Sequence, residues 1–77
     1  MLLDGIVIAE GLRSLRAKKN KTIDEVANEI NIHPNTLSKH EKDATNLKLG
    51  LLKRILEYYG INEIIFFNII SEYTHSE

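Results

Sequence analysis

Residues 22–42 have the sequence TIDEVANEINIHPNTLSKHEK, and this stretch predicts two short helices joined by a tight turn. Thr22 followed by Glu25 three residues later is a capping box, so a helix is expected over about residues 22–30. Pro34 suits the first turn of the next helix, because its φ is fixed and it has no N–H to leave unbonded. This second helix is expected over about residues 34–42. Only residues 31–33 remain to join the two helices, which therefore cross sharply.

The residues at this junction fit a sharp crossing. Ala27 is small enough to stand where the two helices touch. Asn31 tolerates the left-handed backbone conformation in which many helices end. Ile32 can insert from the turn into the core. Together these features predict a helix-turn-helix of the kind that docks on DNA.

Apolar residues at helical spacing predict further helices on both sides of this unit. Upstream, Ile8, Leu12 and Leu15 are separated by four and then three residues, which places them on one face of a helix. Downstream, a similar stripe consists of Leu49, Leu52, Leu56 and Tyr59. Gly60 follows this stripe and is expected to end its helix.

The C-terminal apolar run, residues 61–73, can be interpreted in two ways. A fifth helix beginning after Asn62 is favoured, because Glu63 would lie in its first turn, where the helix dipole stabilises an acid. A strand pairing with Leu2-Leu3 is the alternative, because Ile, Phe and Tyr also favour strands. The expected fold class is all-α with four to five helices. It comprises a helix-turn-helix domain over residues 6–64 and an apolar C-terminal segment over residues 65–77.

The length and composition exclude several classes of protein. A chain of 77 residues can bury one small core, but not the walls of a deep substrate cleft as well. Hydrophobic residues make up 43% and charged residues 27% of the chain, a balance that excludes disordered and collagen-like proteins. No apolar run is long enough for a membrane span. The absence of cysteine excludes disulfides and thiolate metal sites and fits a reducing, cytoplasmic location.

The charge of the chain is unevenly distributed. The formal net charge is −1, which by itself argues against a polyanionic partner. However, all ten basic side chains lie between Arg13 and Arg54, a window with only five acids, so the middle of the chain carries an excess of five positive charges. The flanks contain six acids and no base. A basic middle between acidic ends favours a partner such as nucleic acid.

The order of these motifs resembles the phage-repressor type of helix-turn-helix domain, the Cro/repressor or XRE family, over residues 8–64. The matching positions are Ile8, Leu12-Arg13-Ser14-Leu15-Arg16, Thr22-Ile23-Asp24-Glu25-Val26-Ala27, Ile30-Asn31-Ile32, Asn35-Thr36-Leu37-Ser38-Lys39-His40-Glu41, Leu49, Leu52 and Tyr59-Gly60-Ile61. The resemblance implies an all-helical domain whose third helix enters the major groove of double-stranded DNA. It also implies a transcription regulator, and in particular a repressor that binds a palindromic operator as a homodimer.

The resemblance further implies which residues meet DNA. Base contacts are expected from the exposed face of the third helix, at Pro34, Asn35, Ser38 and Lys39. Phosphate contacts are expected from Lys21, Thr36, Lys42, Lys48 and His33, and from backbone N–H groups at the N-termini of the second and fourth helices. Arg16 and Glu41 are expected to form a buried structural ion pair. The alternative interpretation is that Asn35 and Ser38 are merely polar residues on a solvated helix face.

Four positions depart from the family pattern. His33 stands where the third helix usually has a serine or threonine N-cap, and Lys48 stands where a small hydroxyl would cap the fourth helix. His40 replaces an apolar residue, and Asp43 replaces a glycine. These departures bear on how the domain docks on DNA more than on its fold.

The C-terminal segment has more apolar residues than a small core needs. Its surplus is expected to form the interface of a homodimer, through Phe66, Phe67, Ile69, Ile70 and Tyr73. Alternatively, the segment folds back over the first and fourth helices of its own chain. A different class of function also stays open, in which this segment holds a protein partner, as in an antitoxin or an anti-repressor.

No catalytic, cofactor or metal site is predicted. His33 and His40 are seven residues apart and have no thiolate or third ligand, which makes a poor zinc site. The serines have no histidine and acid at a spacing that supports a catalytic triad, and the chain has no glycine-rich phosphate loop. We therefore expect a protein that is not an enzyme and uses no cofactor.

Overall fold

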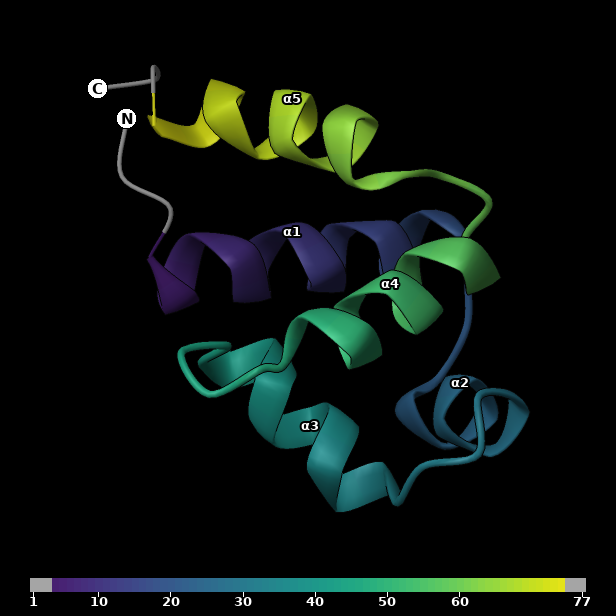
Figure 1. Cartoon of the computed structure of the whole chain (residues 1–77). Helices are drawn as coiled ribbons and strands as arrows, with labels where there is room; N and C mark the ends of the chain where they lie inside the picture. The colour runs from purple at the N-terminus through teal and green to yellow at the C-terminus, as the bar shows by residue number, and fades with distance from the viewer. Residues whose placement is uncertain (1–3, 75–77) are drawn as a thin grey trace.

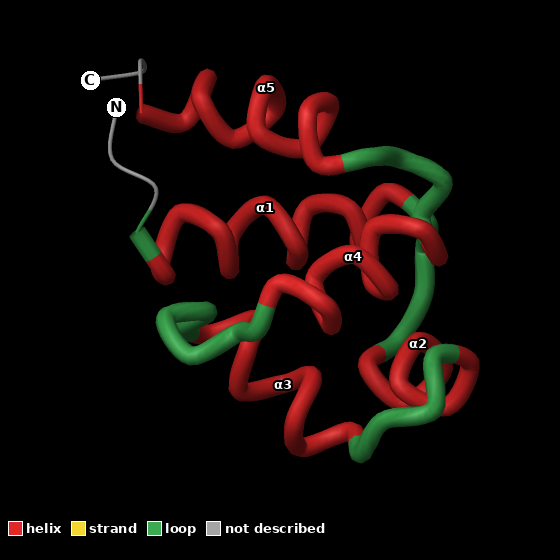
Figure 2. Tube along the Cα trace, in the orientation of Figure 1, coloured by secondary structure: helices red, strands yellow, loops and turns green. Residues whose placement is uncertain are grey.

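The computed structural model describes residues 4–74, with side chains for residues 4–72, and contains five helices. These are α1 (Gly5–Lys18), α2 (Ile23–Glu29), α3 (Pro34–Lys42), α4 (Leu49–Tyr58) and α5 (Glu63–Thr74) (Figure 1). No strand occurs between residues 4 and 74 (Figure 2). The expected all-α fold is thus confirmed, and the strand alternative for the C-terminal run is wrong. The pairing partner in that alternative, Leu2-Leu3, lies outside the described residues.

Side-chain caps explain where several helices begin. Asp4 caps α1 by accepting a hydrogen bond from a backbone N–H of the first turn at 2.8 Å. The expected capping box is present at α2, where Thr22 Oγ1 accepts from the Glu25 N–H at 3.1 Å and the Glu25 carboxylate accepts from the Thr22 N–H at 2.8 Å. Asn62 caps α5 in the same way as Asp4 caps α1, at 2.9 Å. Lys48 precedes α4 and makes no capping hydrogen bond with its side chain.

Left-handed residues explain where three helices end. Asn20, Asn31 and Gly60 have φ angles of 57°, 62° and 78°, and they follow α1, α2 and α4. Asparagine and glycine are the residues that adopt this conformation at the lowest cost. The left-handed turn expected at Asn31 is therefore confirmed, and it leads the chain directly from α2 into α3.

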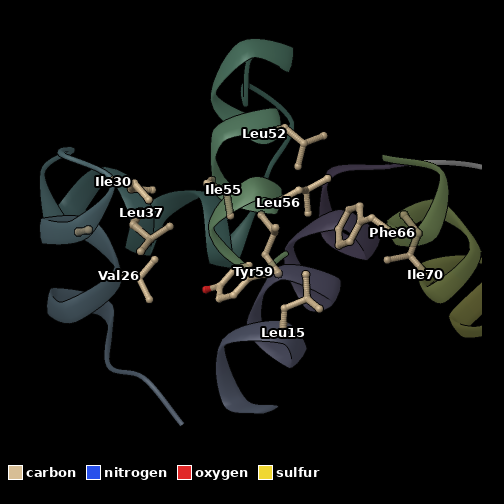
Figure 3. Close-up of a cluster of buried hydrophobic side chains, with 12 residues drawn as sticks. Leu15, Val26, Ile30, Leu37, Leu52, Ile55, Leu56, Tyr59, Phe66 and Ile70 are labelled. Carbon is tan, nitrogen blue, oxygen red and sulfur yellow. The ribbon is translucent and has the colours of Figure 1, made fainter. Parts of the chain in front are cut away.

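All five helices contribute to one hydrophobic core (Figure 3). The core consists of Leu12, Leu15, Val26, Ala27, Ile30, Leu37, Leu52, Ile55, Leu56, Tyr59, Phe66 and Ile70. Ala27 of α2 and Leu37 of α3 are fully buried, as the tight crossing of these two helices requires. A fully buried Leu, Ile or Phe stabilises a fold by about 1.5–3 kcal/mol relative to an exposed one. The turn between α2 and α3 is thus held on a packed core rather than projecting from it.

α5 lies against α1 and completes the core (Figure 1). Phe66 and Ile70, one helical turn apart, are fully buried. They pack over Gly11 of α1, where an added Cβ would overlap a methyl group of Ile70 and approach the Phe66 ring to 2.9 Å. The two helices can come this close because α1 has no side chain at that position.

This packing corrects the expected set of dimer-interface residues. Phe66 and Ile70 belong to the interior of a single chain, because the segment folds back over α1 as the alternative interpretation expected. Phe67 and Ile69 are half-buried, and the side chain of Tyr73 lies outside the described ones. The apolar residues on the outer face of α5 are instead Ile64 and Ile65, which are 72% and 45% exposed.

Candidate nucleic-acid interface

α3 has one buried face and one exposed face. Leu37 and Glu41, four residues apart, face the core, and only 3% of Glu41 is exposed. The four candidate base contacts, Pro34, Asn35, Ser38 and Lys39, differ in their exposure. Asn35 and Lys39 are exposed and one turn apart, whereas Pro34 and Ser38 are half-buried. Asn35 and Lys39 therefore lie on the face of α3 opposite Leu37 and Glu41, while Pro34 and Ser38 lie nearer the border of the buried face.

His33 caps α3 at its N-terminus. Its Nδ1 accepts a hydrogen bond from the Asn35 N–H at 3.1 Å, a role that serine or threonine usually takes. A neutral imidazole carries its single proton on the other nitrogen when Nδ1 accepts, so Nε2 is left as a donor. Because the residue is exposed, this donor remains accessible to an anion. His33 therefore fixes the first turn of α3 in addition to its expected role at a phosphate.

The other candidate phosphate contacts differ in their surroundings. Lys42 and Lys48 are exposed at the end of α3 and the start of α4, and Thr36 is half-buried on α3. Lys21 Nζ lies 3.9 Å from Glu29 Oε2, so its charge already has a neighbouring carboxylate. Of these cations, Lys42 and Lys48 are the best placed to meet a polyanion.

The N-terminus of α2 does not fit the expected phosphate site. Its capping box already uses two backbone donors, and one of the acceptors is the Glu25 carboxylate. The hydrogen bond from the Thr22 backbone lowers the pKa of Glu25, which keeps this carboxyl ionised at neutral pH. A phosphate would meet a negative charge there. The N-terminus of α4 has no such side-chain cap and keeps its donors available.

Arg16 and Glu41 form the expected ion pair between α1 and α3. Arg16 Nε lies 3.0 Å from both carboxylate oxygens of Glu41, and its Nη1 donates to the Lys21 carbonyl at 2.9 Å. Burial raises the pKa of Glu41, and the hydrogen bond from Arg16 opposes that shift. The pair anchors the inner face of α3 to α1, so losing either partner would strand a buried charge.

Two further arginines, which were not among the predicted site residues, contact α2 and α3. Arg13 of α1 donates from Nη1 to the Glu41 carbonyl, and Arg54 of α4 donates from Nη2 to the Ile30 carbonyl. Both acceptors are backbone oxygens at the C-terminal ends of helices. The order of side chains in the sequence does not show which backbone oxygen an arginine can reach in the folded chain. The one indication was that Arg13 lies one helical turn before Arg16, and so on the same side of α1.

Residues 4–74 contain no candidate metal cluster and no candidate membrane span. This part of the chain contains no group of three or more His, Asp or Glu side chains that could hold a metal ion. None of its helices is long and apolar enough to cross a lipid bilayer.

Comparison with known proteins gives one match. Residues 12–66 match a family model described as helix-turn-helix, from the middle of α1 to the first turn of α5. No curated protein and no solved structure matches the chain. The matched region contains α2, the turn at Asn31 and all of α3, together with every residue discussed above as a DNA contact.

Proposed function

The chain belongs to the phage-repressor (XRE) type of helix-turn-helix family and is a DNA-binding transcription regulator; from this premise we propose that it is a cytoplasmic repressor of transcription. It binds a palindromic operator as a homodimer, with one α3 in the major groove at each half-site. The main support is the arrangement of α3. Its inner face is held by Leu37 and Glu41, while Asn35 and Lys39 project from its outer face.

The outer face of α3 carries groups suited to base edges. Asn35 can pair with the N6 and N7 atoms of adenine, and Lys39 can donate to O6 and N7 of guanine. Pro34 offers an apolar surface to a thymine methyl group. Ser38 can donate or accept, so it discriminates between bases only weakly. We therefore assign most of the sequence preference to Asn35 and Lys39.

Phosphates on either side of the reading helix meet Lys42, Lys48, Thr36 and the Nε2–H of His33. Lys48 stands directly before the free backbone donors of α4, and a cation beside free N–H groups is a favourable arrangement for an anion. Lys21 joins this set only when it leaves Glu29 for a phosphate. The contribution of Lys21 is accordingly smaller than that of Lys42 or Lys48.

Selection of bound sequences from a random pool of DNA duplexes tests this proposal. We expect a palindromic consensus with half-sites about one helical turn apart. The variant Asn35→Ala should lose preference at one base position per half-site, at a cost of about 1–3 kcal/mol against the parent sequence. Asn28→Ala, which removes an exposed asparagine from α2, serves as the matched control and should leave the consensus unchanged.

Two results would contradict the proposal. Recovery of no consensus at low salt would reject sequence-specific regulation. An identical consensus for the parent and Asn35→Ala would reject this assignment of α3 contacts while leaving DNA binding intact.

A second candidate function is capture of a protein partner, as in an antitoxin or anti-repressor. The observation that favours it is the exposed apolar pair Ile64 and Ile65 on α5. In that case the chain would bind DNA only weakly and without preference, and it would form a stable complex with a different protein through α5.

A further inference from the structure

The cation at the C-terminal end of α2 comes from another helix. The last four carbonyls of a helix have no partner within the helix, and cations near them also interact favourably with the helix dipole. α2 has no basic residue in its own last turn. Arg54 of α4 supplies that charge from outside, by donating to the carbonyl of Ile30, the C-cap residue.

The acceptor of Arg54 lies directly before the turn that directs α3. Asn31, the next residue, is in the left-handed conformation at φ 62°, and Pro34 begins α3 three residues later. Holding the Ile30 carbonyl therefore fixes the point from which α3 departs. At the other end of α3, Arg13 holds the Glu41 carbonyl from α1. Both ends of the α3 segment are thus tied to helices outside the helix-turn-helix unit.

The surroundings of Arg54 argue against a role at DNA phosphates. The guanidinium borders a shallow hollow of about 430 Å³ between α2 and α4, and two acids, Glu29 and Glu57, line the same hollow. Glu29 also raises the pKa of the neighbouring Tyr58, after the larger effect of burial. A phosphate approaching Arg54 would meet two carboxylates, whereas the Ile30 carbonyl is a neutral acceptor already in contact.

We propose that Arg54 is a positioning residue for DNA recognition, which sets the orientation of α3 by holding the carbonyl at the end of α2 and does not itself contact DNA. This inference rests on the proposed role of α3 as the reading helix. It divides the basic residues by chemistry: arginine, with its planar fork of donors, holds backbone oxygens, while lysine meets the phosphates.

Salt dependence separates a positioning residue from a phosphate contact. The logarithm of the binding constant falls linearly with the logarithm of the salt concentration, and this slope becomes shallower by about 0.9 for each phosphate contact that is lost. Affinities for the selected operator and for random duplex would be measured over a series of salt concentrations. The variants are Arg54→Met, which removes the donors, and Arg54→Lys, which keeps the charge and one donating group. Lys42→Met is the control for a phosphate contact, and Lys53→Met is the control for removing an exposed charge from α4.

For Arg54→Met we expect operator affinity to fall at least about fivefold, the loss from impairing one base contact. Its affinity for random duplex and its salt slope should equal those of the parent, and Arg54→Lys should recover part of the operator affinity. Lys42→Met should weaken both affinities and reduce the slope. The inference is overturned if Arg54→Met behaves like Lys42→Met, if it leaves operator affinity unchanged, or if Lys53→Met reproduces its effect.

Amide hydrogen exchange provides a readout that needs no DNA. In Arg54→Met, the amides of residues 31–37 should exchange faster than in the parent, while those of α1 and α5 keep their rates. Unchanged exchange in residues 31–37 would overturn the positioning role. If Arg54→Met does not fold, the same comparison is made with Arg54→Lys. A parent chain that selects no operator but shows this local acceleration would reject the proposed function and leave the role of Arg54 in the fold standing.

Discussion

His33 occupies the N-cap position of α3, where serine or threonine is usual. Its imidazole caps the helix in place of a hydroxyl group. Its Nδ1 accepts from the Asn35 N–H, so the cap and a candidate base contact are directly linked through the backbone. In the sequence, His33 is recognisable only as a departure from the family pattern, with an expected contact to a phosphate. The capping role could not be predicted, because histidine is an uncommon N-cap and only one of its two nitrogens can serve.

Substitution of His33 tests the cap. His33→Ala should lower the free energy of unfolding by about 1 kcal/mol, the usual effect of removing an N-cap acceptor. His33→Asn should retain most of the stability of the parent, because its amide oxygen can accept in the same place. Urea denaturation measures both. Equal stability of the parent and the alanine variant would show that the hydrogen bond contributes nothing.

Tyr59 presents the opposite situation, a polar group without a partner. Its hydroxyl is buried and has no hydrogen-bond partner among the described residues. Burial raises the pKa of Tyr59, and the charge of Glu41 adds to this effect. An unpaired buried hydroxyl costs about 1–3 kcal/mol.

Removal of that hydroxyl should therefore not harm the fold. We expect Tyr59→Phe to equal or exceed the parent in stability, by up to about 1 kcal/mol, since the ring and its packing are kept. Tyr58→Phe on the half-buried neighbour is the control and should change stability by less than about 0.5 kcal/mol. A clear loss of stability in Tyr59→Phe, measured by thermal unfolding, would mean that the hydroxyl is hydrogen-bonded in solution.

At the scale of helices, the sequence allowed the starts and ends to be predicted but not the contacts between helices. Thr22 with Glu25, and the left-handed residues Asn20 and Asn31, act within a few residues of each other, so their effects follow from local spacing. Gly11 gave no such signal, because its role depends on Phe66 and Ile70, more than fifty residues away in the chain. Strand and helix both stayed open for residues 61–73 because Ile, Phe and Tyr also favour strands, and the packing of this run against α1 is a long-range contact that local spacing does not show.

The close approach of α1 and α5 predicts opposite effects for two glycine substitutions. Alanine is favoured over glycine inside a helix by up to about 1 kcal/mol. Gly11→Ala should nevertheless destabilise the protein by about 1–2 kcal/mol, because its Cβ overlaps Ile70 and Phe66 and overpacking outweighs propensity. Gly50→Ala on α4, where nothing lies within 4 Å of the added Cβ, should be neutral or stabilising by about 0.5 kcal/mol. The free energies of unfolding of the two variants are compared directly. A Gly11→Ala variant as stable as Gly50→Ala would refute the close contact.

At the scale of the whole molecule, only part of the positive charge in the middle of the chain is available to bind a partner. Arg13, Arg16 and Arg54 are engaged with backbone oxygens and with Glu41, so the charge that remains for DNA is carried by lysines. The total could be counted from the sequence. Its division between folding and binding depends on which oxygens lie nearby and could be seen only in the folded chain.

We propose that the homodimer, if it forms in place of a complex with another protein, uses the outer face of α5 at Ile64 and Ile65, and charging that face tests this interface. Ile64→Asp should convert the proposed homodimer to a monomer in sedimentation equilibrium and weaken operator binding, without affecting the fold, since the side chain is 72% exposed. Ile6→Asp places the same charge at another exposed isoleucine, on α1, and should remain dimeric. A folded, dimeric Ile64→Asp protein would exclude this face as the interface.

The two faces of α5 also make the stability of the protein depend on its concentration. Phe66 and Ile70 on the inner face hold the core together, while Ile64 and Ile65 on the outer face serve the proposed dimer. Assembly of the proposed dimer would stabilise the fold by mass action, so the midpoint of thermal unfolding should rise with protein concentration. In a cell with few copies, the chains would be mostly monomeric and more often open to proteases. Scarce regulator would be cleared faster than abundant regulator, so proteolysis would sharpen the difference between its low and high expression states.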